Sequence, residues 1–283
     1  MKAMTLGQLL LQGKKELRQA EVPDGDYDAW ILMEHALQIE KSYYFLHRND
    51  KMEEEQVENY LSCIQKRKQR IPLQHITGSA WFMGYEFYVN SNVLTPRFDT
   101  EILVEAVSKH LKPDMEILDV CTGSGCILLS LLAEYKDWNL KGTGVDISPE
   151  ALEVAMINNE RLGMRAKLLE SDLFSKVNGT YDIIVSNPPY IATKELETLM
   201  PEVKEHEPRL ALDGKEDGLY FYRKIVEQAG DFLKDGGWLC FEIGYDQGDA
   251  LKELLLSHGY TDVSIKKDLA GLDRVAQGKF QKN

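Results

Sequence analysis

The chain has 283 residues, enough for one large domain or two modest ones, and its 43% hydrophobic content is ordinary for a soluble globular protein. Its net charge of −13 argues against a protein that grips bare nucleic acid through its whole surface, because neutralising phosphates needs clustered lysine and arginine. The four cysteines form no CxxC pair and the six histidines no HExxH motif, so we expect no structural metal. So few cysteines in a chain of this length fit the reducing cytoplasm. No apolar run approaches the roughly 20 residues that a membrane span needs.

The first 75 or so residues show helical periodicity and no strand alternation. Thr5 is a candidate N-cap for a helix with leucines on one face, and further helical patterns follow Asp26 and Ser42. A longer pattern over residues 53–70 has acids early and bases late, an order that complements the helix dipole. Its basic end is typical of a solvated helix terminus, with a partner-binding patch as the alternative. We predict a small helical bundle, residues 1–75, that recognises a partner or substrate.

Residues 79–90 alternate aromatic and polar side chains around Met83-Gly84, which predicts a β-hairpin. Such a hairpin would link the two parts of the chain over residues 76–95. Its aromatic side chains are more typical of packing than of a binding surface, although a binding surface is the alternative.

From about residue 96 strand patterns alternate with helix patterns. The strand candidates are Glu116–Cys121, Gly142–Ile147, Ala166–Ser171, Tyr181–Ser186 and Trp238–Ile243, with Thr261–Lys267 and Arg274–Lys279 as a final pair. The helix candidates are Cys126–Tyr135, Pro149–Leu162, Leu219–Leu233 and Gln247–His258. This order predicts an α/β fold with a mostly parallel, seven-stranded, Rossmann-like sheet that helices cover on both faces. Ligands on such a sheet bind at the carboxyl ends of the strands.

The first strand candidate ends in a glycine-rich loop, Asp119-Val120-Cys121-Thr122-Gly123-Ser124-Gly125. Gly123 and Gly125 would let the backbone approach a ligand closely in a tight strand-to-helix turn. The loop could be a dinucleotide fingerprint, but Leu128 takes the place of the third glycine, which argues against NAD. Asp119 would repel a pyrophosphate and suits a cationic amino-acid head.

The next two strand candidates also end in acidic residues. Asp146 lies 21 residues past Gly125, close to the roughly 20 expected of a carboxylate that binds a ribose. We expect Asp172 to accept the amino group of an adenine and Leu173 to pack on its ring. Each aspartate alone could be a helix cap or a turn residue. Their order along successive strand ends favours a site for an amino acid, a ribose and an adenine.

The fourth strand candidate runs into Asn187-Pro188-Pro189-Tyr190. A planar nitrogen is a poor nucleophile because its lone pair is delocalised, so an enzyme that methylates it must aim that lone pair out of the plane. The Asn187 side-chain oxygen and the Pro188 carbonyl could each accept one N–H, and prolines with fixed φ would hold these acceptors stiffly. The Tyr190 ring could cover the flat face of the target. The alternative is a proline-rich loop that merely ends a strand.

With these motifs the chain resembles the class I S-adenosylmethionine-dependent methyltransferases, and within them the release-factor glutamine methyltransferases. The resemblance covers nearly the whole length. It is carried by residues 74–78, 96–101, 187–191, 207–212 with 217–219, 242–244 with Gln247, and 268–271 with 273–274, although Asp99 stands where glutamate is usual. Cys121 departs from the glycine common at its position, and we expect its backbone to avoid φ values that only glycine tolerates. Leu173 departs from the aromatic residue that some members place against adenine.

The resemblance implies a methyltransferase domain over residues 96–283 after the helical domain and the hairpin. It implies methyl transfer from S-adenosylmethionine to the side-chain N5 of the glutamine in the Gly-Gly-Gln motif of peptide chain release factors, by a monomer that binds neither membrane nor nucleic acid. The implied cofactor-binding residues are Asp119, Cys121, Thr122, Gly123, Ser124, Gly125, Asp146, Asp172, Leu173 and Asn187. The implied substrate-binding residues are Asn187, Pro188, Pro189 and Tyr190, with Asn187 and Pro188 as the catalytic pair.

Two alternatives remain open at this point. An N6-adenine methyltransferase acting on DNA or RNA would use the same loop and the same Asn-Pro-Pro-Tyr, but it must flip a base and bind phosphates, which the −13 charge disfavours. An inactive methyltransferase fold could serve as a binding module, which the intact Asn187 and glycine loop disfavour.

Overall fold

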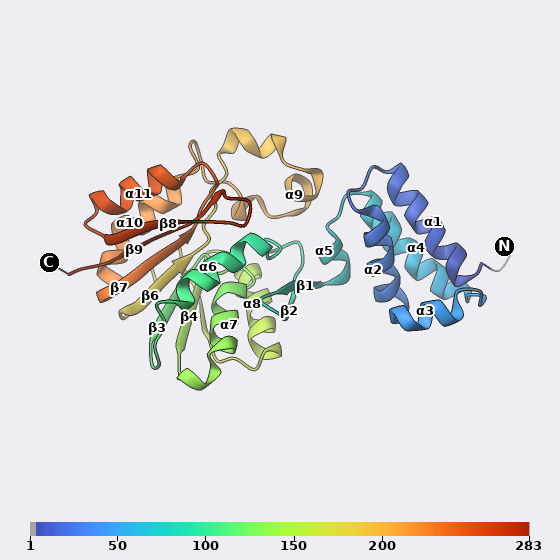
Figure 1. Ribbon diagram of the computed structural model, residues 1–283, viewed down its shortest axis with the longest axis horizontal. Helices are drawn as coiled ribbons and strands as arrows, with labels where there is room; N and C mark the ends of the chain where they lie inside the picture. The colour runs from blue at the N-terminus through green and yellow to red at the C-terminus, as the bar shows by residue number, and fades with distance from the viewer. Residues whose placement is uncertain (1–3, 283) are drawn as a thin grey trace. The chain divides into compact units, whose positions relative to one another are not determined.

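The computed structural model describes residues 4–282, so residues 1–3 and 283 of the predicted domains lie outside it. The chain divides into two compact units (Figure 1). We call Met1–Ser79 with Met200–His206 the helical unit, and Ala80–Leu199 with Glu207–Asn283 the sheet unit. Among residues 4–282, no helix has the length and apolar character that a membrane crossing needs.

The helical unit confirms the predicted small all-α region. Its helices are α1 (Leu6–Gln19), α2 (Gly25–Leu37), α3 (Lys41–His47), α4 (Glu54–Lys68), α5 (Leu73–Thr77) and α9 (Pro201–His206). Thr5 caps α1 as predicted: its hydroxyl accepts from the Gln8 backbone N–H at 3.3 Å, and the Gln8 side chain accepts from the Thr5 N–H at 3.0 Å. The core is formed by one face of each long helix, with Leu9, Leu17, Leu32, Met33, Tyr60 and Ile64 fully buried.

A buried ionic cluster occupies the basic end of α4. Arg67 is 5% exposed and donates to Asp28 at 2.7 Å and to Glu202 at 2.9 Å, while Arg70 donates to both oxygens of Glu202 at 2.6 and 2.7 Å. The interpretation of this basic run as a solvated helix end is therefore wrong for Arg67. Its partner Glu202 lies on α9, far along the chain, and no local pattern signals such a long-range pair.

The predicted hairpin forms as β1 (Ser79–Phe82) and β2 (Tyr85–Tyr88). Met83 and Gly84 both have positive φ, +51° and +76°, as a two-residue turn that matches the strand twist requires. Phe82 and Phe87 are buried in the core of the sheet unit, in agreement with the packing interpretation, whereas Trp81 is 64% exposed and does not follow it.

The large sheet confirms the predicted α/β fold, with seven strands in the order β5-β4-β3-β6-β7-β9-β8. The strands are β3 (Glu116–Val120), β4 (Lys141–Asp146), β5 (Lys167–Glu170), β6 (Tyr181–Ser186), β7 (Leu233–Glu242), β8 (Thr261–Lys267) and β9 (Asp273–Lys279). The first five are parallel and β9 runs antiparallel to β7 and β8. β7 begins at Leu233, earlier than the predicted Trp238, because Leu233 already pairs with Tyr181.

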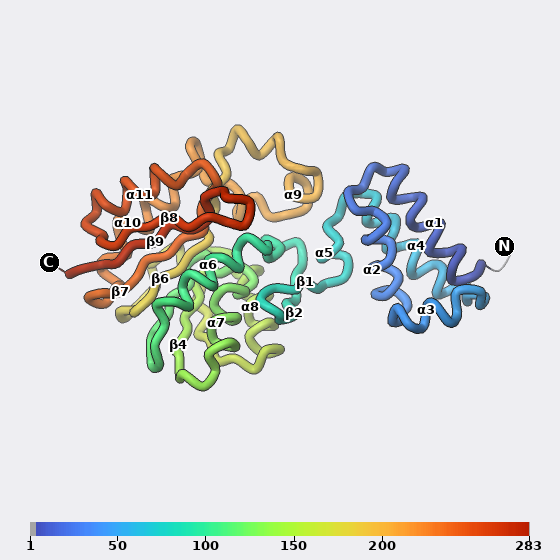
Figure 2. Tube along the Cα trace, viewed as in Figure 1, coloured from blue at the N-terminus to red at the C-terminus, as the bar shows by residue number. Residues whose placement is uncertain are grey.

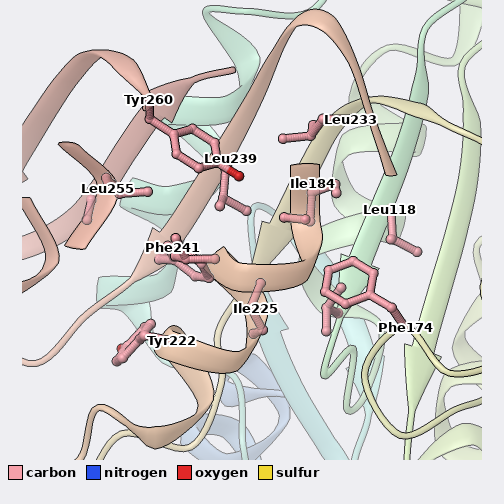
Figure 3. Packing of buried hydrophobic residues seen from close by; sticks show 14 of the residues in the cluster. Leu118, Phe174, Ile184, Tyr222, Ile225, Leu233, Leu239, Phe241, Leu255 and Tyr260 are labelled. Carbon is pink, nitrogen blue, oxygen red and sulfur yellow. The ribbon is translucent and has the colours of Figure 1, made fainter. Parts of the chain in front are cut away.

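Helices cover both faces of this sheet, as predicted. They are α6 (Phe98–Ser108), α7 (Cys126–Glu134), α8 (Pro149–Arg161), α10 (Tyr220–Phe232) and α11 (Gly248–Ser257), with 3-10 turns at Lys136–Trp138, Thr193–Thr198 and Arg209–Ala211. On one face, side chains of α10 and α11 such as Ile225 and Leu255 pack on Leu118, Ile184 and Phe241 (Figure 3). On the other, α6 and α7 pack on the alternate residues of the same strands. The pattern leaves the strand ends free to build a site.

The long connection between β6 and α10 follows the Asn-Pro-Pro-Tyr motif and is drawn in gold in Figure 2. It carries α9, which groups with the helical unit, before the chain returns to the sheet unit at Glu207. No pattern in the sequence predicts that residues 200–206 group with the helical unit.

Candidate functional site

The strand order reverses between β3 and β6, and at such a switch point the loops after neighbouring parallel strands part to leave a crevice. Val120 at the end of β3 is in register with Val145 of β4 and with Ser186 of β6. Asp146 is in register with Glu170 of β5. The glycine loop, Asp146, Asp172 and Asn187 therefore emerge at one edge of the sheet.

A cavity lies at this edge. Its lining includes Cys121, Thr122, Gly123 and Ser124 of the glycine loop, Asp146, Asp172 and Leu173, and Asn187 and Pro189. The predicted site residues Asp119, Gly125, Pro188 and Tyr190 do not line it. The cavity thus brings together the groups expected at four different strand ends.

Asp119 lies beneath the glycine loop and not at the cavity surface. Its carboxylate accepts from the Thr122 hydroxyl at 2.6 Å and is fully buried. Burial, followed by repulsion from Asp146, raises the pKa of Asp119 to about 7, although the Thr122 hydrogen bond opposes the shift. Asp119 therefore acts on the loop, and through the loop on any ligand.

The expectation for the Cys121 backbone is wrong. Cys121 has φ +61°, in the left-handed region that glycine favours, which costs a residue with a Cβ about 1–2 kcal/mol. Burial raises the pKa of its thiol well above the usual value, and the charges of Asp146 and Asp119 add to the shift. The β3–α7 turn imposes this conformation whatever the side chain, so the small thiol is tolerated at a cost. Leu173 has the same backbone handedness, with φ +48°.

Asp146 is fixed by backbone donors on both sides. One carboxylate oxygen accepts from the Gly123 N–H at 2.9 Å and the other from the Ser148 N–H at 3.0 Å. Burial raises its pKa, and these hydrogen bonds offset only part of the shift. Each oxygen keeps a second lone pair, so the carboxylate can still accept two hydroxyl groups of a ligand.

Tyr190 is half-buried and tied away from solvent. Its hydroxyl donates to Glu242 Oε1 at 3.2 Å, and its ring packs against the core shared by β6 and β7. Burial raises the pKa of the Tyr190 hydroxyl, and the neighbouring Glu242 charge adds to the shift. Asn187 is partly exposed at the cavity, whereas Pro188 and Pro189 are buried.

Residues from segments 92–97 and 208–211, together with Phe221, line a second wall of the cavity. The motifs in the sequence had assigned no role to these segments. Arg97 and Glu207 join the two segments, because the Arg97 guanidinium contacts both Glu207 oxygens at 2.7 Å. Pro96-Arg97 and Glu207-Pro208-Arg209 carried the family resemblance, and that resemblance was the one signal that could have marked them.

The cavity lining fits a ligand with a diol, an amine and a flat apolar surface. The carboxylates of Asp146 and Asp172 can accept hydrogen bonds, and the side chains of Leu173 and Ile147 beside them are apolar. No group of three or more His, Cys, Asp or Glu side chains within residues 4–282 is placed to hold a metal ion. The site can hold such a ligand and present a second, planar group to it at Asn187.

Comparison with known proteins places both parts of the chain. Residues 8–78 match the family described as the PrmC N-terminal domain, and residues 97–215 match the methyltransferase small domain. The release factor glutamine methyltransferase of Clostridium acetobutylicum is 40% identical over 88% of this chain and 89% of its own length. That of Caulobacter vibrioides is 40% identical over 97% of this chain and 96% of its own length.

A solved methyltransferase from Pyrococcus furiosus superposes with a TM-score of 0.55 at 21% identity, covering 77% of this chain and 100% of that one. At this identity the likeness concerns the fold alone.

Proposed function

We propose that this chain, which belongs to the family of release factor glutamine methyltransferases, transfers a methyl group from S-adenosylmethionine to the side-chain N5 of a glutamine in a peptide chain release factor. The target would be the glutamine of the Gly-Gly-Gln motif. The observation that carries the proposal is the meeting of Asn187 with the glycine loop and Asp146 in one cavity. Family membership favours this function over the N6-adenine alternative.

The residues present fit the proposed cofactor. Asp146 would accept the ribose hydroxyls, Asp172 the adenine amino group, and Leu173 would pack on the purine, all from positions that line the cavity. The turn from Cys121 to Gly125, supported from below by Asp119, would receive the amino-acid end. When bound, S-adenosylmethionine supplies a methyl group activated by a sulfonium.

Asn187 and Pro188 would hold the substrate amide. The Asn187 side-chain oxygen and the Pro188 carbonyl would each accept one N–H, which leaves the nitrogen lone pair aimed out of the amide plane. Held in this way, the amide nitrogen would be placed to take the activated methyl group in line, with release of the demethylated cofactor, and would give its proton to water. The chain contributes mainly by positioning, which can supply several kcal/mol. Pro189 would close the cavity beside the amide, and Tyr190 would support the loop through the hydrogen bond of its hydroxyl to Glu242.

The partner proposal rests on the family. We propose that the helical unit recognises the release factor and that the enzyme is a monomer in the cytoplasm. The four cysteines are free thiols, which suits a reducing compartment.

The proposal is tested with the purified protein and methyl-labelled S-adenosylmethionine, incubated separately with a purified release factor and with DNA. Peptide mass mapping should place the label on the glutamine of the Gly-Gly-Gln motif. A release factor with that glutamine replaced by alanine is the matched control and should take up no label. Label on adenine, or on another residue of the release factor, would overturn the proposal.

A further inference from the structure

Gln247, at the turn between β7 and α11, is a buried polar residue to which the proposed function gives no role. It is 9% exposed. Its side-chain Nε2 donates to the Tyr190 carbonyl at 3.0 Å and contacts the Gly218 carbonyl at 3.4 Å. One side chain from the end of β7 therefore holds the last residue of the Asn-Pro-Pro-Tyr motif and the segment that precedes α10.

The orientation of the Gln247 amide is set by a third hydrogen bond. Its Oε1 accepts from the Gly244 N–H at 2.9 Å, so Nε2 is the end that faces the two carbonyls. An amide group has one acceptor end and one donor end, and both ends of this one are used. Replacing it with an apolar side chain of equal length would leave buried carbonyls without their donor.

The loop that Gln247 reaches is held closely from its other side. The Ile191 N–H donates to the Leu212 carbonyl at 3.1 Å, and the Gly214 N–H donates to the Ile191 carbonyl at 2.8 Å. A Cβ at Gly214 would lie 2.8 Å from the Tyr190 Cα, and a side chain at Gly218, with φ +74°, would collide with the Tyr190 carbonyl. Only glycine permits this approach. The backbone at Tyr190 thus sits between two glycines and one amide.

We infer that Gln247 is a positioning residue for methyl transfer, acting through the Tyr190 carbonyl; the inference rests on the proposed function. Pro188 and Pro189 lie between Asn187 and Tyr190, and their fixed φ makes this short stretch stiff. A shift at Tyr190 therefore passes to the two groups that hold the substrate amide. A misplacement of about 1 Å in such groups can cost about 100-fold in rate.

The first test is Gln247→Met, which keeps the length of the side chain and removes the amide. We expect kcat on the release factor to fall about 10- to 100-fold, while the Kd for S-adenosylmethionine and the KM for the release factor stay within about twofold. Gln228→Met is the matched control, because within residues 4–282 the Gln228 amide donates only to the Lys224 carbonyl of its own helix. It should leave all three constants unchanged.

Gln247→Glu separates positioning from folding. An ionised carboxylate can accept from Gly244 but cannot donate to the Tyr190 carbonyl, whereas a protonated carboxyl regains one O–H donor. The ratio of variant to wild-type kcat should therefore rise as the pH falls. A ratio that stays flat with pH would contradict the donor role.

Hydrogen exchange gives a reading that does not depend on the substrate. In Gln247→Met the amides of residues 190–192 should exchange several-fold faster, while those of β6 stay protected. An unchanged kcat, or a parallel loss of cofactor affinity and of protection across the sheet, would overturn the inference. If the wild-type protein methylates no release factor, the proposed function fails, and the exchange result still decides whether Gln247 holds the loop.

Discussion

Glu202 of the helical unit and the carboxylates at the strand ends of the sheet unit have pKa values that are shifted in opposite directions. Asp28, which also contacts Arg67, differs from Glu202, because burial raises its pKa. In the helical unit, burial raises the pKa of Glu202, but hydrogen bonds from Arg70 and Arg67 outweigh it and hold that pKa below its ordinary value. At the strand ends of the sheet unit, burial raises the pKa of Asp119, Asp146 and Glu242, whose hydrogen-bond partners are neutral hydroxyl and backbone N–H groups. For Glu242 this shift persists although the charge of Arg274 opposes it.

The difference suggests that Glu202 stabilises the fold, whereas Asp146 and its neighbours serve the proposed ligand site. Glu202 is ionised and compensated, so its contribution belongs to the folding of the helical unit. Asp146 and its neighbours are left with donors too weak to compensate their burial, as is common where a ligand completes the environment. Substitutions at the two places should therefore lower different quantities.

The largest effect on stability should come from Glu202→Gln. It removes the anion that Arg70 and Arg67 share, although Arg67 keeps Asp28 as a partner, and breaking a buried pair from one side costs about 3–5 kcal/mol. The partly exposed Arg70 places this variant at the lower end of the range. Urea denaturation should show the loss, with cofactor affinity unchanged. Glu205→Gln, on the exposed side of α9, should cost little. Equal stability of Glu202→Gln and Glu205→Gln would break the comparison.

Asn187→Ala should have the converse effect, a large loss of activity and little loss of stability. It removes one of the two proposed amide acceptors, and we expect single-turnover rates to fall at least about 100-fold. Isothermal titration should find the affinity for S-adenosylmethionine within a few-fold of wild type. A wild-type rate in the variant would remove Asn187 from the mechanism.

Asp146→Ala should weaken cofactor binding by about 1–3 kcal/mol, since it leaves ribose hydroxyls and the Gly123 and Ser148 N–H groups without their acceptor. Its effect on the free energy of unfolding should be smaller than that of Glu202→Gln, because no buried cation loses its partner. Undiminished affinity, measured by titration, would mean that the ribose binds elsewhere.

The site was predictable from the sequence where strand order alone fixes it. Asp146, Asp172 and Asn187 each follow a strand pattern, and parallel strands present their ends at one edge, so their meeting required no knowledge of packing. The left-handed Cys121 backbone was missed because the turn decides φ there and the side chain does not. The Arg67–Glu202 pair and the grip of Gln247 on Tyr190 were missed because each joins residues far apart in sequence.

The smallest expected effect is a change in how folding stability depends on pH in Glu242→Gln. It tests directly whether Glu242 and Glu202 differ in the direction of their pKa shifts. Because the folded pKa of Glu242 is raised, the unfolded chain ionises first as the pH rises above about 4.5, and wild-type stability falls up to the raised folded pKa. The glutamine variant lacks this loss, so it should gain stability relative to wild type as the pH rises above about 4.5.

For Glu202 the sign is reversed. Its lowered folded pKa gives stability that is present above about 4.5 and is lost as the pH falls through the folded pKa. Glu202→Gln should therefore lose stability relative to wild type as the pH rises toward about 4.5, whereas Glu242→Gln should gain it as the pH rises above about 4.5. Thermal unfolding of both variants and the wild type on both sides of this pH measures the two slopes. Slopes of the same sign would mean that Glu242 is ionised and compensated like Glu202, and that the contrast between the two units does not hold.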